Sequence, residues 1–139
     1  MLLKDKFIYI VEDNTQNRVV FQMCLLREGA RVEFERHGKE AVQHLSSIRN
    51  VDLILLDLML AKGVSGFDIY DQIRARAEFA KLPIIAVSAM DPEDALPKVR
   101  RKGFNGFIAK PIDSEILAAQ IVQVLAGGQV WDAGGTKAY

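Results

Sequence analysis

Short runs of apolar residues recur along the chain, and the stretches between them follow the period of an α-helix. Residues 7–11 are apolar, β-branched and aromatic but too few for a helix, and 53–56 and 84–87 show the same pattern. Residues 107–109 are a weaker version, and 32–35 alternate between apolar and acidic side chains. Continuous apolar strands are typical of the middle of a parallel sheet covered on both faces, whereas alternation favours an edge strand.

Helical spacing of apolar residues fills the gaps between these runs. A broad apolar set over 19–26 predicts a first helix that ends near Gly29, and the stripe Leu117, Ile121, Val124 predicts the last. Five β-α units in about 127 residues predict an α/β fold with a doubly wound, five-stranded parallel sheet. We expect the flavodoxin-like strand order 2-1-3-4-5, with helices on both faces. One domain is expected over 1–126, followed by a flexible, glycine-rich tail at 127–139 and no output domain.

Composition narrows the class of protein. The 139 residues hold 18 basic and 18 acidic side chains, which argues against a protein that binds nucleic acid directly. One cysteine excludes an internal disulfide framework and fits a reducing compartment. No apolar run approaches the ~20 residues that cross a membrane, and the start of the chain does not resemble a signal peptide. We therefore expect a cytoplasmic protein without membrane insertion.

Charged and hydroxyl side chains stand where the predicted strands end. Glu12 and Asp13 follow the first strand, Asp57 the third, Ser88 the fourth and Lys110 the fifth. Ligands of such sheets bind outside the carboxyl ends of the strands, so these groups are expected in one crevice. Three neighbouring carboxylates repel each other unless some of them are protonated or a cation lies among them, and an oxygen-only ligand set suits Mg²⁺. A divalent ion, an ammonium and a hydroxyl around one carboxylate favour phosphoryl transfer, with Asp57 as the candidate acceptor.

Other sites for phosphate chemistry fit the same positions less well. The loop after the first strand has no glycine and two acids, which disfavours a flavin or dinucleotide site, and no P-loop motif occurs. An aspartate-dependent phosphohydrolase would carry a second aspartate two residues after Asp57, where this chain has Met59. A metal-dependent phosphohydrolase therefore stays a weaker alternative.

The full set of residues resembles the receiver domain of two-component response regulators over residues 6 to about 126. The matching positions are the acidic pair Glu12-Asp13, Asp57, Ser88 followed by Ala89, Phe107, and Lys110-Pro111. The segment 11–18 is most similar to the receivers of hybrid histidine kinases and phosphorelays.

The resemblance implies a role for each matching residue. Asp57 would be phosphorylated from a histidine, and Mg²⁺, or Mn²⁺ in its place, would bind Asp13, Asp57 and the backbone carbonyl of Met59, with Glu12 acting through water. Lys110 would contact the phosphoryl group.

The resemblance also implies a switch. Ser88, followed by Ala89, would move toward the phosphoryl group, and Phe107 would turn inward behind Ser88. This would change the face formed by the fourth helix, fifth strand and fifth helix. Lys110-Pro111 would be a cis peptide bond, and Met59 and Met90 would tune dephosphorylation.

These roles imply a phosphoacceptor switch, which is not an enzyme beyond its own phosphorylation and dephosphorylation. Its donor would be a histidine kinase or a histidine phosphotransfer protein, and a downstream protein would read the switch face. It would be a monomer or a weak, phosphorylation-dependent dimer, acting as a single-domain regulator or phosphorelay intermediate. Two alternatives stay open: an interaction module that no longer uses phosphate, and a receiver excised from a hybrid histidine kinase.

Two segments depart from the family pattern. The stretch from Asp57 to Gly66 is one residue longer than usual and lacks a proline, which predicts a more mobile loop beside the metal. Pro97 falls inside the fourth predicted helix, where it predicts a kink or a shorter helix.

Several other residues have ordinary structural explanations. Asp13 or Asn14 is a candidate helix cap, and Cys24 is expected in the core. His37 and His44 show no ligand-like spacing and receive no role, and Trp131 is left without one.

Overall fold

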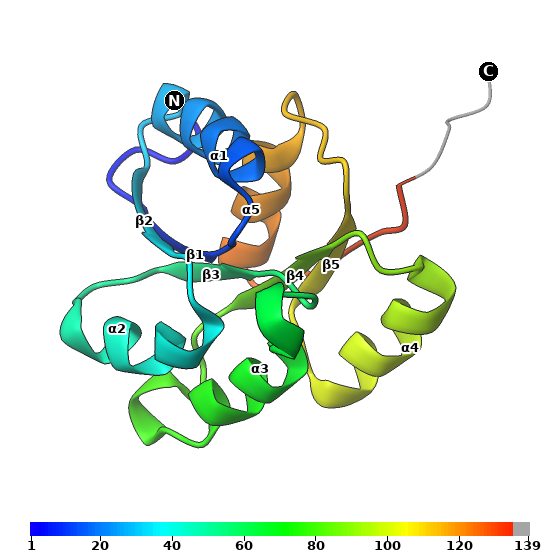
Figure 1. Cartoon of the computed structure of the whole chain (residues 1–139). Helices are drawn as coiled ribbons and strands as arrows, with labels where there is room; N and C mark the ends of the chain where they lie inside the picture. Colours follow the sequence, from blue (N-terminus) through cyan, green and yellow to red (C-terminus); the bar gives the residue numbers. More distant parts are fainter. Residues whose placement is uncertain (135–139) are drawn as a thin grey trace.

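The computed structural model of the chain describes residues 1–134, and residues 135–139 lie outside the described part. Strands and helices alternate along the chain (Figure 1). The strands are β1 (Phe7–Val11), β2 (Arg31–Glu35), β3 (Leu53–Leu56), β4 (Ile84–Ser88), β5 (Gly106–Ala109) and β6 (Val130–Asp132). The α-helices are α1 (Thr15–Arg27), α2 (Ala41–Ser47), α3 (Gly66–Arg74), α4 (Pro92–Lys102) and α5 (Leu117–Leu125). Short 3-10 turns cover Gly38–Glu40, Ala61–Gly63 and Ala77–Phe79.

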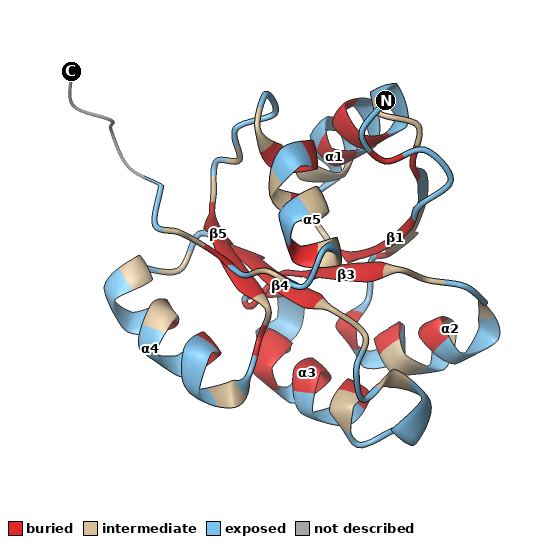
Figure 2. Cartoon of the chain, turned by 180° about the vertical axis from the view of Figure 1, so that it is seen from behind, coloured by how far each residue is buried: buried red, intermediate tan, exposed pale blue. Residues whose placement is uncertain are grey.

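The strands form one parallel sheet in the order β2-β1-β3-β4-β5-β6. Every residue of β1, β3, β4 and β5 is buried, as their continuous apolar sequences predicted, while β2 lies at an edge and is partly exposed. Helices α1 and α5 pack on one face, and α2, α3 and α4 pack on the other (Figures 1 and 2). The doubly wound α/β fold and the order 2-1-3-4-5 are confirmed for the first five strands.

The sixth strand is a correction to the sequence analysis. The segment from residue 127 was expected to be a flexible tail outside a five-stranded sheet, which is wrong for Val130–Asp132 because this stretch pairs in parallel with β5. The ordered domain therefore extends past 126 to at least 132. The last five residues of the predicted tail, 135–139, lie outside the described residues.

Local capping explains where the helices begin. The side chain of Asn14 accepts a hydrogen bond from the Asn17 N–H at the start of α1, so Asn14 and not Asp13 is the cap. Ser65 caps α3 in the same way through the N–H of Phe67. These caps fix where α1 and α3 begin, and they leave the Asp13 side chain available for another role.

Helix α4 accommodates its internal proline. The helix runs from Pro92 to Lys102 without interruption, so the predicted shortening at Pro97 does not occur. Proline lacks the N–H that would bond the Glu93 carbonyl, but Glu93 and Pro97 are both exposed, so water can hydrate that carbonyl. Among residues 1–134, no helix is long and apolar enough to span a membrane.

Candidate functional site: an acidic crevice at the strand ends

The groups predicted at the strand ends meet around Asp57. Glu12 and Asp13 follow β1, Asp57 follows the adjacent β3, and Lys110 reaches back from the end of β5. The Lys110 Nζ lies 2.6 Å from Glu12 Oε1 and 2.9 Å from Asp57 Oδ2. One ammonium therefore bridges carboxylates that are 98 and 53 residues away in the sequence.

The three carboxylates form a compact set of oxygen ligands. Glu12, Asp13 and Asp57 each offer an oxygen, and these atoms lie within 4.8 Å of one another. Glu12 is 1% and Asp57 5% exposed, while Asp13 is partly exposed and keeps the set open on one side. Three hard oxygen donors opposed by a single ammonium leave excess negative charge, so the donor chemistry fits Mg²⁺.

Burial and charge shift the pKa values of the two central groups. Burial raises the pKa of Asp57 above its ordinary value, and the Met59 N–H and Lys110 oppose this without cancelling it. Burial alone would lower the pKa of Lys110, but its hydrogen bonds to Glu12 and Asp57 and their negative charges raise it overall. Lys110 is therefore a firmly charged partner for whichever anion occupies the crevice.

Backbone N–H groups hold the carboxylates in place. Asp57 Oδ1 accepts from the Met59 N–H at 3.1 Å, and Glu12 Oε2 accepts from the Asn14 N–H at 3.1 Å. Asp13 Oδ2 accepts from the N–H of Ala61, which belongs to the loop after β3. Because each acid accepts a hydrogen bond from a backbone N–H, local for Glu12 and Asp57 and distant in sequence for Asp13, the set is oriented before any cation binds.

The longer loop after β3 is folded against the site. Leu60 N–H donates to the Val64 carbonyl, and an isolated bridge pairs Met59 with Ser65. At Gly66 a Cβ would meet the Asp57 carbonyl oxygen at 2.1 Å, so only glycine allows α3 to begin this close to the acceptor. The extra residue is accommodated within the loop after β3, and the predicted mobility of this loop stays a prediction.

The remaining predicted residues lie at the end of β4, on β5 and directly after β5. Ser88 is fully buried, and its Oγ accepts from the Met90 N–H at 3.1 Å, while Ala89 between them is exposed. Phe107 is fully buried on β5. The Lys110–Pro111 peptide bond is cis, as the resemblance implied.

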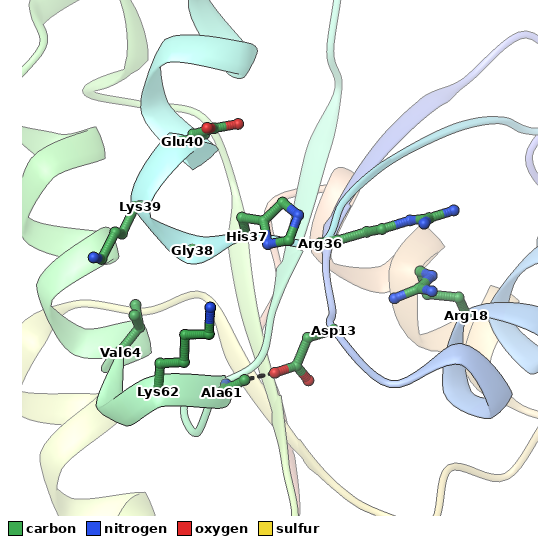
Figure 3. A pocket seen from close by; sticks show the side chains of 10 residues that line it. All are labelled: Asp13, Arg18, Arg36, His37, Gly38, Lys39, Glu40, Ala61, Lys62 and Val64. Carbon is green, nitrogen blue, oxygen red and sulfur yellow. Dashed lines mark hydrogen bonds between the residues drawn. The ribbon is translucent and has the colours of Figure 1, made fainter.

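A cavity of about 580 Å³ opens beside Asp13 (Figure 3). Its walls carry more basic than acidic side chains: Arg18, Arg36, Lys39 and Lys62 with His37, against Asp13 and Glu40. Arg18 is anchored by hydrogen bonds to the Glu12 carbonyl and the Thr15 hydroxyl, both 3.1 Å. The acidic crevice therefore borders a basic cavity, which sequence analysis missed because its residues come from three separate segments of the chain: residues 13–18, 36–40 and 61–64.

A second carboxylate cluster lies at the carboxyl end of the edge strand β2, next to β1. His44 Nδ1 lies 2.7 Å from Glu35 Oε1, and His44 Nε2 lies 3.0 Å from Glu33 Oε2. Glu35 is 7% exposed, and its other oxygen accepts from the His37 N–H at 2.7 Å. The sequence indicated only that Glu33 and Glu35 would share one face of an edge strand; it did not indicate that His44 would lie between them.

Fold and site together define an α/β protein with an acidic, cation-ready crevice at the carboxyl ends of a parallel sheet. The sequence pattern of the response regulator receiver domain matches residues 8–122, so this chain belongs to that family and is a receiver domain of two-component signalling.

Relatives of very different length share this domain. The chain is 30% identical to protein PilH of Pseudomonas aeruginosa over 120 residues, which cover 86% of this chain and 98% of PilH. It is also 30% identical over 118 residues to the autoinducer sensor kinase/phosphatase CqsS of Vibrio cholerae, covering 84% of this chain. It spans only 17% of the length of CqsS and 52% of the Streptomyces coelicolor regulator AfsQ1. The same domain thus occurs alone and as a part of larger proteins.

Solved structures agree with the fold. The receiver domain of the sensor histidine kinase PA1611 from Pseudomonas aeruginosa, which holds a magnesium ion in its active-site cleft, superposes with a TM-score of 0.76 at 30% identity. The match covers 89% of this chain and 99% of that one. The chemotaxis protein CheY4 of Vibrio cholerae has the same fold, with a TM-score of 0.76 at 21% identity over 84% of this chain and 96% of that one.

Proposed function

We propose that the chain accepts a phosphoryl group on Asp57 from the phosphohistidine of a histidine kinase or a histidine phosphotransfer protein. The observation that carries the proposal is the bridge from Lys110 to Glu12 and Asp57, inside a set of three carboxylates whose oxygens lie within 4.8 Å. This arrangement surrounds one carboxylate with groups that compensate negative charge.

The residues divide the chemistry between them. An Asp57 carboxylate oxygen attacks phosphorus, the bond from phosphorus to the donor imidazole nitrogen breaks, and its electron pair stays on that nitrogen. Glu12, Asp13 and Asp57, with the Met59 carbonyl, would hold Mg²⁺ or Mn²⁺, which offsets the charge on the phosphoryl oxygens. Lys110 keeps its proton and stabilises the same oxygens, and Met90 N–H keeps the Ser88 hydroxyl oriented until it turns toward them.

The basic cavity supports donor access from the side of Asp13. Arg18 and Lys62 line it (Figure 3), so an approaching phosphoryl donor meets positive charge before it reaches the acids. Met59 is 59% exposed, so its side chain is placed to influence water entry and hence dephosphorylation. Met90, which is partly buried after β4, would influence dephosphorylation from the side of Ser88.

Signalling would run through a protein partner at α4, β5 and α5, with Ser88 and Phe107 as the internal switch. The protein would catalyse only its own phosphorylation and dephosphorylation, as a monomer or a weak dimer. It would serve as a separate regulator or phosphorelay intermediate, or as the receiver part of a longer kinase. The cytoplasmic setting expected from the sequence belongs to this proposal.

The test is phosphoryl uptake. The protein is incubated with Mg²⁺ and acetyl phosphate and, separately, with a phosphorylated histidine phosphotransfer protein, and intact mass is measured. We expect one added phosphoryl group, no uptake in Asp57→Asn and normal uptake in Asp68→Asn, an exposed aspartate on α3. No adduct from either donor would favour the phosphate-independent interaction module, and turnover of a phosphomonoester would favour a hydrolase.

A further inference from the structure

The short strand β6 closes the edge of the sheet beside β5. The two strands run parallel, with Phe107 opposite Trp131 and Ile108 opposite Asp132. A Cβ at Gly106 would meet the Val130 carbonyl oxygen at 2.7 Å, so the absence of a side chain lets the backbones approach. Gly106 therefore makes this edge of β5 suited to receive an added strand.

Side chains of α5 hold the segment 129–134, which we call the strap, from one side. Gln120 Nε2 donates to Asp132 Oδ2 at 2.9 Å, and Gln123 Nε2 donates to the Gln129 carbonyl at 2.9 Å. Within the strap, the Gly134 N–H donates to Asp132 Oδ1 at 2.8 Å. Asp132 is thus bound through both carboxylate oxygens, which fixes the turn that ends β6.

Trp131 holds the strap from the side of α4. Its partly buried indole packs against the core cluster that contains Phe107, and the Arg100 guanidinium lies 4.6 Å from the ring centroid. The contact joins β6 to an exposed residue of the helix. The strap therefore connects α5 to α4 across β5, as the course of the chain after α5 shows (Figure 1).

The strand that carries the strap also carries the lysine of the acidic crevice. β5 ends at Ala109, and Lys110 then binds Asp57 through Nζ and the Ser88 carbonyl through its backbone N–H at 2.9 Å. Phosphorylation of Asp57 bonds phosphorus to a carboxylate oxygen next to Lys110, so the hydrogen bonds of the Lys110 ammonium have to change. β6 is an edge strand that pairs with β5 over three residues, against four for β4, so it is the less extensively paired neighbour of β5.

We propose that the strap is a regulatory cover: it closes the β5 edge while Asp57 is unmodified and is released when Asp57 carries a phosphoryl group. This inference rests on the proposed function of Asp57. The released edge accepts an extended segment of a partner protein by strand addition. The partner segment is aromatic and then acidic, the pattern that Trp131 and Asp132 present in the closed form.

The chain contains a single tryptophan, so Trp131 reports on the strap directly. Emission and acrylamide quenching of the full chain are measured with Mg²⁺, before and after acetyl phosphate, while intact mass gives the phosphorylated fraction. Hydrogen exchange of residues 128–134 is followed in the same samples. We expect red-shifted emission, stronger quenching and lost protection in proportion to the phosphorylated fraction, with none of these in Asp57→Asn.

Two variants test the fastenings, and a third serves as a control. Gln120→Ala removes one hydrogen bond to Asp132 and should shift the ratio of closed to released strap about fivefold toward release. Arg100→Gln should act in the same direction, whereas Arg101→Gln, an exposed neighbour on α4, should leave Trp131 unchanged. A fluorescein-labelled peptide with the sequence of residues 128–134 should bind the phosphorylated protein and not the unmodified one, as judged by anisotropy.

The outcomes separate the two proposals. A phosphoryl adduct with unchanged Trp131 emission, quenching and exchange overturns the strap and leaves Asp57 as acceptor. The absence of any adduct overturns the proposed function and the phosphorylation-dependent strap with it. Release of the strap without peptide binding overturns strand addition by a partner.

Discussion

Two clusters of carboxylates, each with at least one buried member, lie at the carboxyl ends of neighbouring strands and differ in their partners. Glu33 and Glu35 enclose the ring of His44, and the second oxygen of Glu35 accepts a backbone N–H. The crevice at Asp57 gathers three carboxylates around one lysine and stays open at Asp13. The first cluster places two carboxylates around an imidazole ring, whereas the second brings three carboxylate oxygens within 4.8 Å of one another, which suits a cation.

The contrast shows that buried acids do not define a site by themselves. Within residues 1–134 every buried side-chain nitrogen and oxygen has a hydrogen-bond partner, so both clusters are satisfied. What distinguishes the crevice is its set of three carboxylate oxygens within 4.8 Å of one another, its opening at Asp13 and the convergence of groups from β1, β3 and β5. The four predictions below test this distinction, from the largest expected effect to the smallest.

Lys110→Ala should have the largest effect. Loss of the ammonium leaves Glu12 and Asp57 buried without a counter-charge, which should lower the free energy of unfolding by about 3–5 kcal/mol without metal. The control is Lys102→Ala, which breaks an ion pair with the exposed Asp71 and should cost about 0.5 kcal/mol. Urea denaturation in EDTA measures both variants, and equal losses would contradict a special role for Lys110 in the crevice.

His44→Ala should destabilise the fold without touching phosphoryl uptake. Glu35 loses its side-chain partner while it remains buried, which should cost about 2 kcal/mol. His37→Ala, at an exposed side chain, should change stability by about 0.5 kcal/mol or less. Thermal unfolding measures stability, and intact mass after treatment with acetyl phosphate measures phosphoryl uptake. Loss of uptake in His44→Ala would show that the His44 cluster is needed for the chemistry at Asp57.

Mg²⁺ should stabilise the protein through the crevice alone. At ten times its dissociation constant the ion should add about 1.4 kcal/mol to the free energy of unfolding. Asp13→Asn should remove most of this gain, and Asp68→Asn should keep it. The gain should shrink as pH falls, because the ligands bind the ion as carboxylates. A gain that persists in Asp13→Asn would place the ion elsewhere.

Asp57→Asn should raise the melting temperature slightly at neutral pH without metal. The folded-state pKa of Asp57 is raised, so the folded protein binds that proton more tightly than the unfolded chain. The contribution of Asp57 to stability is therefore greatest below its ordinary pKa of 3.8 and is lost as pH rises through the raised value. The advantage of asparagine should narrow toward acid, and a widening gap would reverse the sign of the shift.

Much of the crevice could be predicted because its residues occupy strand ends. The apolar runs before Glu12, Asp57 and Lys110 are local patterns, and a parallel sheet brings their carboxyl ends to one edge. Helix caps such as Asn14 are local in the same sense. The expectation that these residues lie together follows from their order along the chain.

The features that sequence analysis missed depend on contacts between distant segments. The partners of His44 come from strand β2, and Arg18 of helix α1 joins a cavity wall built from three separate chain segments. Residues 130–132 are too few to show strand periodicity. Their contacts as β6 are made by distant residues: Gly106 pairs with Val130, Gln120 binds Asp132, and Arg100 lies over Trp131. Pro97 was expected to shorten α4, but its missing bond falls on the exposed side of the helix.

The sequence alone therefore determined the α/β architecture and the identity of the acids, because these follow from local periodicity and from position at strand ends. Only the tertiary structure decided that Lys110 bridges Glu12 and Asp57, that the loop at Ala61 binds Asp13, and that the segment after α5 becomes a sixth strand. The physical reason is that such contacts are selected by packing and charge in three dimensions, where residues far apart in the chain become neighbours.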